Sequence, residues 1–346
     1  MTNTAPPFDV AALQRYLQAQ VPDLGADLAV TPFAGGQSNP TYLVSDGRHR
    51  LVLRKKPPGE LLPSAHAVDR EFRVISALQG TGVPVARPVC LCEDPSVIGT
   101  VFYVMDFVEG RIFWDPALPE LSGPQRRALY DDMNRVVAAL HAVRPEAVGL
   151  QDYGRQGQFL ARQVARWSRQ YQASETEPIE AMHRLIDWLP GHIPDSEAHG
   201  IVHGDLRLDN MIFHPDEPRV IAVLDWELST LGDPLADLAY HMLPWHLTAQ
   251  AFRGMAGRDL QSLDIPSERD YLDLWLQRTG HPPVSTETWT VYLVYNLFRL
   301  AAILQGIARR ALDGTAAASN AAQTGAKATL IADIAWQMAR HRLGAA

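Results

Sequence analysis

The chain has 346 residues, of which 47% are hydrophobic and 20% are charged. These proportions are typical of a globular protein and exclude disordered and fibrous classes. The formal net charge of −8 argues against an extended surface for nucleic acid or an anionic membrane, because such surfaces need clustered Lys and Arg. We therefore expect neither nucleic acid nor membrane as a partner, and we expect a monomer or a homodimer.

Short β-branched or alternating runs, separated by turn residues, predict a meander of five strands at the start of the chain. Between the third and fourth strands, apolar residues at helical spacing predict one helix from Ser64 to Leu78. Ser64 is its expected N-cap, and Gly80 and Gly82 follow its end. The predicted strands cover residues 28–34, 41–46, 50–55, 85–92 and 100–106.

Cys90 and Cys92, the two cysteines of the chain, are two residues apart in the fourth predicted strand, so their side chains share one face. This spacing suits small core residues better than a disulfide or a metal pair, which would need a C-x-x-C or further ligands. Free cysteines indicate a reducing compartment. The opening residues have neither the basic patch nor the apolar core of a signal peptide, so we expect a cytoplasmic protein.

The character of the sequence changes after Gly110, where long helical patterns replace the strands. We place a lobe boundary near residues 107–110, which gives an N-terminal lobe at 1–107 and a C-terminal lobe at 108–346. The predicted fold class is α+β and bilobal, with a five-stranded antiparallel sheet and one helix followed by a mainly helical lobe. The later helical patterns cover residues 122–143, 155–173, 177–190, 233–243, 268–279, 286–310 and 323–343, and the strand-like pieces cover 200–203, 211–214 and 219–224.

The run His203-Gly204-Asp205, with Asn210 and Asp225 beyond it, has the spacing that phosphoryl transfer requires. Such a reaction needs one carboxylate to orient the attacking hydroxyl and accept its proton, and Asp205 has that position. It also needs oxygen ligands for Mg²⁺, which as a hard cation prefers carboxylates and amide oxygens. Asn210, five residues on, and Asp225, after an apolar strand, are the predicted metal ligands. Their spacing favours chemistry over a set of unrelated caps and turns.

The order His-x-Asp-x-x-x-x-Asn, then Asp, resembles the protein-kinase signature, but Gly204 replaces the usual Arg and Asp-Trp-Glu replaces Asp-Phe-Gly. With these departures the chain resembles the aminoglycoside phosphotransferase and choline kinase family, which has a protein-kinase-like fold. The segments 35–42, 53–59 and 62–71 add a resemblance to the phosphotransferase domain fused to certain acyl-CoA dehydrogenases. The resemblance implies ATP and Mg²⁺ as cofactors and a hydroxylated small molecule as substrate, and the fused relatives suggest a hydroxy acid or a hydroxyacyl-CoA.

A glycine-containing loop between the first two strands suits phosphate contacts, because the N–H groups of glycine can approach an anion closely; a plain hairpin fits the same residues. The resemblance also implies a cation at the end of the third strand, for which Arg54 comes first and Lys55 second, with Glu71 as its partner. The adenine is expected against Met105 and the backbone of 106–108. The residues predicted to contact the nucleotide are Gly35, Gly36, Gln37, Ser38, Asn39, Arg54, Lys55, Glu71, Met105, Asp106 and Val108.

The helix predicted over 286–310 places Tyr292, Asn296 and Arg299 on one face and is expected to be buried, because its polar residues do not suit a membrane span. Arg299 must either pair with an internal carboxylate or meet an anionic group of the substrate. We predict these three residues as substrate contacts. An acidic or CoA-linked acceptor is therefore favoured over an aminoglycoside.

Other readings stay open at this point. An aminoglycoside kinase and a catalytically weak ATP-binding scaffold are the two alternatives within the fold. A protein kinase is disfavoured because only about seven residues separate Asp225 from Gly232-Asp233, too few for the usual peptide-docking segment. A metal hydrolase on His203, Asp205 and His214 would leave the spacing to Asp225 unexplained. Asp233 is predicted as a helix N-cap, and Asp237, one turn later, as support for the catalytic loop.

Overall fold

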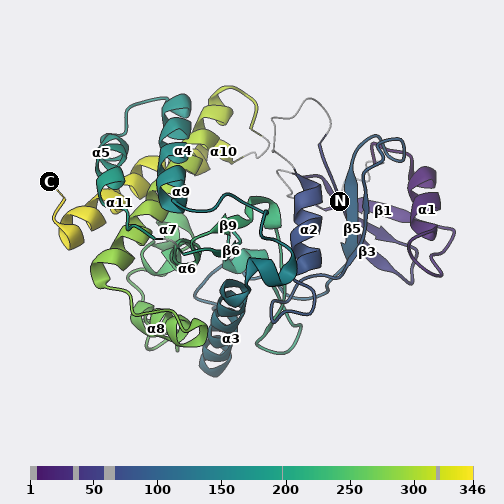
Figure 1. Ribbon diagram of the computed structural model, residues 1–346, viewed down its shortest axis with the longest axis horizontal. Helices are drawn as coiled ribbons and strands as arrows, with labels where there is room; N and C mark the ends of the chain where they lie inside the picture. Colours follow the sequence, from purple (N-terminus) through teal and green to yellow (C-terminus); the bar gives the residue numbers. More distant parts are fainter. Residues whose placement is uncertain (1–5, 34–38, 58–66, 197, 317–319, 346) are drawn as a thin grey trace.

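The computed structural model describes residues 6–33, 39–57, 67–196, 198–316 and 320–345. A sheet with two helices forms the N-terminal part, and a larger, mainly helical part follows it (Figure 1). The chain passes between the two parts just after strand β5, which ends at Asp106. The predicted α+β, bilobal class is therefore the fold that the chain adopts.

The N-terminal sheet has five strands in the order β1-β2-β3-β5-β4, and every neighbouring pair is antiparallel. All five predicted strands are confirmed in place. β4 lies at the edge because the chain crosses from β3 through a helix before it returns beside β5. The strands are β1 (Ala29–Pro32), β2 (Thr41–Ser45), β3 (Arg50–Lys55), β4 (Pro88–Cys92) and β5 (Phe102–Asp106).

Two helices cover opposite faces of this sheet (Figure 1), where the sequence predicted one. Helix α2 (Val68–Ala77) packs on the face that carries Val52 and Met105. Its predicted N-cap Ser64 lies outside the described residues. Helix α1 (Val10–Gln18), which was missed, buries Leu13 and Leu17 on the other face and is capped by Asp9.

Cys90 and Cys92 belong to the cluster beneath α1, which confirms that they are core residues. Both are free and buried. Burial raises the pKa of the Cys90 thiol to about 12, so this side chain is a neutral apolar group at physiological pH.

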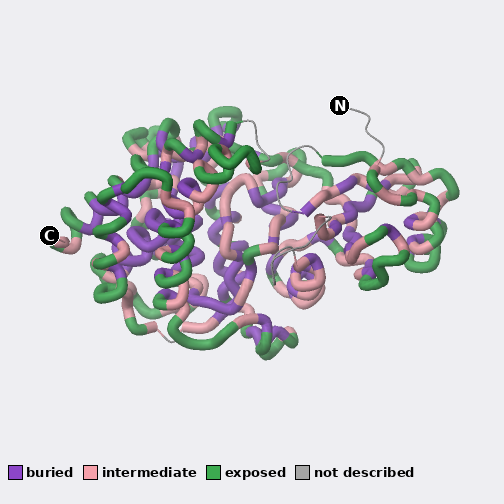
Figure 2. Tube along the Cα trace, turned by 90° about the horizontal axis from the view of Figure 1, so that it is seen from above, coloured by how far each residue is buried: buried purple, intermediate pink, exposed green. Residues whose placement is uncertain are grey.

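The C-terminal part is built from helices packed around one long central helix, α9, together with two small two-stranded ladders, β6–β9 and β7–β8. Figure 2 shows buried segments running through the middle of this part. The strands are β6 (Gly200–Val202), β7 (Met211–Phe213), β8 (Val220–Val223) and β9 (Thr230–Gly232). The helices are α3 (Gly123–Ala142), α4 (Phe159–Ser174), α5 (Glu180–Trp188), α6 (Pro234–His241), α7 (Ala249–Phe252), α8 (Glu268–Thr279), α9 (Thr286–Leu312), α10 (Ala321–Gly325) and α11 (Ala328–Leu343).

Helix α9 packs against α4, α6, α10 and α11, which confirms the predicted buried helix. Among the described residues it is the one helix that is long and apolar enough to cross a membrane, yet 78% of its most apolar window is buried inside the protein. Core helices of soluble proteins satisfy the same test, so these features follow from its central position in the lobe.

Candidate active site

The catalytic loop begins where β6 ends and leads into β7 through a single 3₁₀ turn, Leu208–Asn210. Gly204 at its start has a φ of +82°, a conformation that favours glycine. A Cβ at this position would lie only 2.7 Å from the carbonyl oxygen of Leu228. The loop therefore packs closely against the segment that follows Asp225, and this packing requires glycine.

Asp237 supports the backbone of this loop through hydrogen bonds, as predicted. Its carboxylate accepts hydrogen bonds from the amides of His203 at 2.7 Å and Gly204 at 2.9 Å, and it also contacts Nε2 of His141 at 3.2 Å. Burial opposes the charge of Asp237, but the hydrogen bonds and charges of the two histidines outweigh burial and lower its pKa. A buried carboxylate thus fixes the backbone just before Asp205. The predicted N-cap Asp233 is also confirmed, since its side chain accepts from the amide of Leu235.

His203 connects the loop to the strand that precedes Asp225. Its Nδ1 accepts from the amide of Asp205, and its Nε2 donates to the carbonyl of Leu224 at 2.7 Å. Both ring nitrogens are therefore used within the protein. The described residues contain no group of three or more His, Cys, Asp or Glu side chains that could hold a metal ion, so the hydrolase reading on His203 and His214 has no support there.

The carboxylate of Asp205 is surrounded by donors. Arg207 lies with Nε 3.0 Å from Oδ1 and donates from Nη2 to Oδ2 at 3.1 Å. Asn210 donates from Nδ2 to Oδ2 at 3.0 Å and to the Asp205 carbonyl at 2.7 Å. The hydroxyl of Tyr240 donates to Oδ1 at 2.8 Å. Sequence reasoning predicted Asp205 and Asn210 but gave no role to Arg207 and Tyr240; the position of Arg207, two residues after Asp205, was the available signal.

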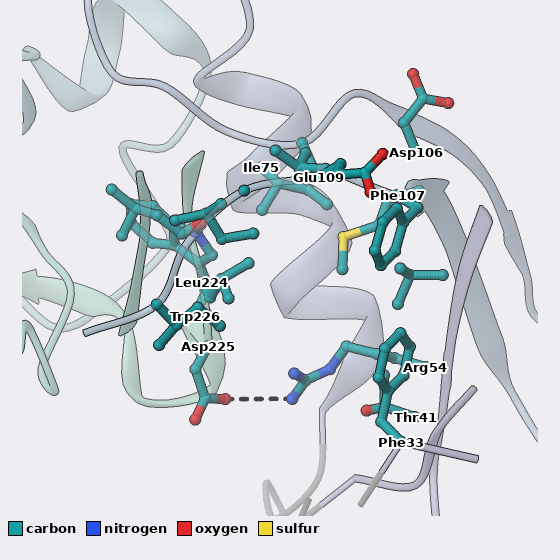
Figure 3. A pocket seen from close by; sticks show the side chains of 18 of the residues that line it. Phe33, Thr41, Arg54, Ile75, Asp106, Phe107, Glu109, Leu224, Asp225 and Trp226 are labelled. Carbon is teal, nitrogen blue, oxygen red and sulfur yellow. Dashed lines mark hydrogen bonds and ion pairs between the residues drawn. The ribbon is translucent and has the colours of Figure 1, made fainter. Parts of the chain in front are cut away.

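Asp225 faces the catalytic loop from the end of β8. Its φ of +65° places it in the left-handed region, which Asp tolerates better than most residues. This turn directs the carboxylate toward the N-terminal lobe, where Oδ1 lies 3.2 Å from Nη2 of Arg54 (Figure 3). The ion pair joins β3 to the C-terminal part across the cleft.

Arg54 is the cation of this cleft, and Lys55 is not. Because successive strand residues point to opposite faces, Arg54 lines the cleft while Lys55 is buried on the other side of the sheet, with Nζ 3.4 Å from the carbonyl of Lys56. The predicted nucleotide contact of Lys55 therefore does not lie at this pocket in the structure. Nε of Arg54 lies 3.0 Å from Oε2 of Glu71, as predicted. Burial opposes the charge of Arg54, but the acidic groups around it outweigh burial and raise its pKa.

Glu71 is fixed by two further donors. Nδ2 of Asn39 donates to it at 2.6 Å and the hydroxyl of Tyr103 at 3.0 Å. Asn39 is 2% exposed, so in this structure it orients Glu71 and does not line the cleft itself. Gly35, Gly36, Gln37 and Ser38 lie outside the described residues.

Between the two parts lies an apolar pocket of about 390 Å³, bounded at its inner end by Arg54 and Asp225 (Figure 3). Met105 and Val108 line it, as predicted. Asp106 lines it through its backbone only, because its carboxylate forms a two-point ion pair with Arg87. The other lining residues include Phe33, Val52, Ile75, Ala86, Tyr103, Phe107, Ile112, Ile212, Val223 and Trp226.

A second, more polar cleft of about 830 Å³ borders the catalytic loop at Gly204. We call it the basic cleft, because Arg70, Arg155, Arg166 and Arg299 line it and none of them pairs with a carboxylate among the described residues. Its two acidic residues already have arginine partners: Asp152 pairs with Arg73, and Glu227 lies 3.9 Å from Arg54. The cleft therefore carries a net positive charge.

With this geometry established, comparison with known proteins identifies the family. Residues 29–274 match the phosphotransferase enzyme family. The chain belongs to this family. A Ralstonia eutropha protein, described provisionally as an aminoglycoside phosphotransferase, has a crystal structure that is 49% identical and covers 96% of this chain and 98% of its own, with a TM-score of 0.88.

Curated relatives of this phosphotransferase are longer proteins. Mouse acyl-CoA dehydrogenase family member 10 is 46% identical over 95% of this chain and 31% of its own length. Mouse family member 11 is 41% identical over 97% of this chain and 44% of its own length. The chain thus spans less than half of the length of either relative. The aminoglycoside phosphotransferase APH(4)-Ia, in complex with AMP-PNP and hygromycin B, shares the fold at 14% identity, with a TM-score of 0.63 over 96% of this chain and all of its own.

Three residues of helix α9 were predicted to contact the substrate, and one of them lines the basic cleft. Arg299 lines the basic cleft and donates to the Gly204 carbonyl. Tyr292 instead donates to Asp233 at 2.6 Å, and Asn296 donates to the carbonyl of Ala236 at 2.8 Å. Both are buried against α6 and line neither cleft, so the structure does not bring these two predicted substrate residues to the site.

Proposed function

We propose that this phosphotransferase moves the γ-phosphoryl group of ATP to a hydroxyl group of a small anionic molecule. The observation that carries the proposal is the position of Asp205. The loop that carries Asp205 borders the basic cleft at Gly204. Asp225 borders the apolar pocket, and the hydrogen bond from His203 to the Leu224 carbonyl connects it to the same loop. A loop that lies beside two pockets of such different character suits a reaction between an adenine nucleotide and a polar acceptor.

The apolar pocket suits the adenine ring and ribose. Its side chains offer an apolar slot near Met105, and the amides of Asp106 and Phe107 already donate to the carbonyls of Arg87 and Arg50. We therefore expect Val108 to supply the backbone donor to adenine. The phosphates would then extend inward to Arg54, whose planar guanidinium suits phosphate oxygens. The nucleotide analogue bound to APH(4)-Ia supports the choice of ATP.

The residues beside Asp225 fit Mg²⁺ by their chemistry. Asp225 offers carboxylate oxygens, and Asn210 offers an amide oxygen, because its Nδ2 is engaged with Asp205. Mg²⁺ is commonly held by one or two carboxylates together with substrate phosphates, and the described residues contain no all-protein metal cage. When bound there, Mg²⁺ would neutralise charge on the phosphates.

In the reaction, Asp205 orients the acceptor hydroxyl and takes its proton as the oxygen attacks the γ-phosphorus, while the bond from this phosphorus to the β,γ-bridging oxygen breaks and ADP leaves. Arg54 holds phosphate oxygens and is itself held by Glu71. Asp237 keeps the loop still beneath Asp205 through two backbone hydrogen bonds. Most of the effect of these groups is positioning and charge stabilisation.

The basic cleft supports an anionic acceptor. Four arginines without carboxylate partners among the described residues would repel a polycation and attract a carboxylate or phosphate. A hydroxy acid or a hydroxyacyl-CoA has such groups, and the acyl-CoA dehydrogenase relatives make the thioester the first acceptor to try. An aminoglycoside kinase is less well supported, since polycations bind to acidic surfaces.

We expect Asp225→Asn to remove the response to Mg²⁺ while leaving the fold intact. Asp225 has 36% of its side chain exposed, so the neutral isostere costs little stability, yet it removes the charge that binds the cation. In a thermal-shift assay, MgATP should raise the Tm of the wild type and raise that of the variant much less. Asp216→Asn, on the exposed hairpin between β7 and β8, is the matched control. An unchanged MgATP response in Asp225→Asn would contradict the assignment.

The acceptor is tested by MgATP turnover with hydroxyacyl-CoAs, hydroxy acids, choline-type alcohols, homoserine-type compounds and aminoglycosides. Anionic acceptors should be phosphorylated preferentially, and Arg166→Ala should raise their KM about tenfold, as expected for one lost charged contact. Arg169→Ala is the control, because Arg169 is exposed one turn further along α4 and does not line the cleft. Preference for aminoglycosides would overturn the anionic assignment. Stabilisation by MgATP without any turnover would favour an ATP-binding scaffold.

A further inference from the structure

We propose that Tyr240 is a positioning residue for the catalytic carboxylate, with its hydroxyl fixing the Oδ1 atom of Asp205 for proton transfer. The inference rests on the proposed function, because it assigns a partner to the base of that reaction. Tyr240 lies near the end of α6, one turn beyond Asp237, so a single helix supports the loop backbone and the side chain of Asp205.

The contact is built to be rigid. Tyr240 is 5% exposed, and its hydroxyl lies 2.8 Å from Oδ1. Its ring faces the guanidinium of Arg299, whose Cζ lies 4.7 Å from the ring centroid, and Arg299 in turn donates to the Gly204 carbonyl. The tyrosine is thus held by α6, by the cation and by the loop that it serves.

Tyr240 can act only as a donor in this position. Burial, together with the nearby carboxylate, raises the pKa of its hydroxyl above the ordinary range, so the proton stays on the phenol throughout the physiological range. A neutral donor to Oδ1 orients the carboxylate without neutralising the charge that a general base needs. A cation on the ring face strengthens such a donor by drawing electron density from the ring.

The donors around Asp205 also differ in how easily an acceptor hydroxyl could displace them from the carboxylate. An ionised carboxylate has about four lone-pair sites. Here Oδ1 accepts from Tyr240, and Oδ2 accepts from Nη2 of Arg207 and Nδ2 of Asn210. Nε of Arg207 lies 3.0 Å from Oδ1 without forming a hydrogen bond. An acceptor hydroxyl needs one of these sites. Tyr240 and Asn210 are buried, whereas Arg207 has 28% of its side chain exposed and also lies 3.5 Å from Asp209. We therefore assign the fixed contact to Tyr240 and the exchangeable one to Arg207.

The test compares Tyr240→Phe with Tyr171→Phe. Tyr171 is a fully buried tyrosine that also donates to a carboxylate, Glu175 at 3.0 Å, but it has no contact with the catalytic loop. The assay is MgATP hydrolysis, with water as the acceptor, measured at one fixed pH. Tyr240→Phe should lower kcat about 10- to 100-fold with KM for MgATP unchanged, since a hydrogen bond to a charged group is lost. Tyr171→Phe should leave both kcat and the KM for MgATP unchanged.

A structural readout makes the result independent of turnover. In a crystal structure of Tyr240→Phe, the Asp205 carboxylate should leave its wild-type orientation or occupy more than one rotamer. An unchanged carboxylate together with an unchanged kcat would overturn the inference while leaving the proposed function intact. If MgATP neither stabilises the wild type nor is hydrolysed by it, the proposed function fails, and the crystal structure still decides the contact between Tyr240 and Asp205.

Discussion

Asp205→Asn should lower phosphoryl transfer by about 10³-fold while MgATP still raises the Tm of the protein. The amide keeps the shape of the side chain but cannot accept the proton of the acceptor hydroxyl, and general base catalysis contributes about 10² to 10⁴ in rate. Asp205 lies outside the apolar pocket, so nucleotide binding should persist. The measurement is kcat by ADP release, beside thermal shift with MgATP, using the first acceptor found in the screen.

The same Asp216→Asn variant controls for the loss of a negative charge in this lobe. It removes an exposed carboxylate without touching either cleft. Turnover in Asp205→Asn close to that of the control would exclude Asp205 as the base and would move attention to other carboxylates of the site, such as Glu227.

Asp237→Ala should destabilise the protein by about 3 to 5 kcal/mol, in the range for removal of one member of a buried charged network. The substitution leaves the amides of His203 and Gly204 without their buried acceptor, and His141 without its partner. The free energy of unfolding from urea titration measures this loss. Asp187→Ala, exposed on α5, should change it by less than about 0.5 kcal/mol.

The pH dependence of the free energy of unfolding tests the same role of Asp237. The folded-state pKa of Asp237 is lowered from its ordinary value of 3.8, so its contribution to stability is present above about pH 4 and is lost as the pH falls through the folded pKa. Wild-type stability should therefore fall more steeply below pH 4 than that of Asp237→Ala. Parallel acid curves for the two proteins would show that Asp237 is not charged in the folded state.

The sequence predicted the strands of the sheet and the catalytic loop well because both depend on local patterns. Alternating runs define the strands, and a fixed spacing relates Asp205 to Asn210 and Asp225. The same pattern also favoured Arg54 over Lys55, and in the structure Arg54 lines the apolar pocket while Lys55 is buried on the other face of the sheet. Helix α1 was missed, although Asp9 is a typical N-cap and Leu13 and Leu17 have the i, i+4 spacing of one helix face.

Contacts between distant elements could not be predicted in this way. The i, i+4 spacing showed that Tyr292 and Asn296 share a face of α9, but it could not show that this face meets α6. The role of Tyr240 could not be predicted for the same reason, because its hydroxyl reaches Asp205 only where α6 packs beneath the loop. Such roles depend on tertiary packing, and a single sequence does not show which helices pack against each other.

The close approach of Leu228 to Gly204 limits how this enzyme could be regulated. Protein kinases usually have an arginine at the position of Gly204, and that arginine binds the phosphate group of a phosphorylated activation segment. Here any side chain at position 204 would collide with the Leu228 backbone, and the positive φ would oppose it as well. A single substitution therefore cannot restore control by a phosphorylated segment, and evolution toward such control would first have to rebuild the turn after Asp225.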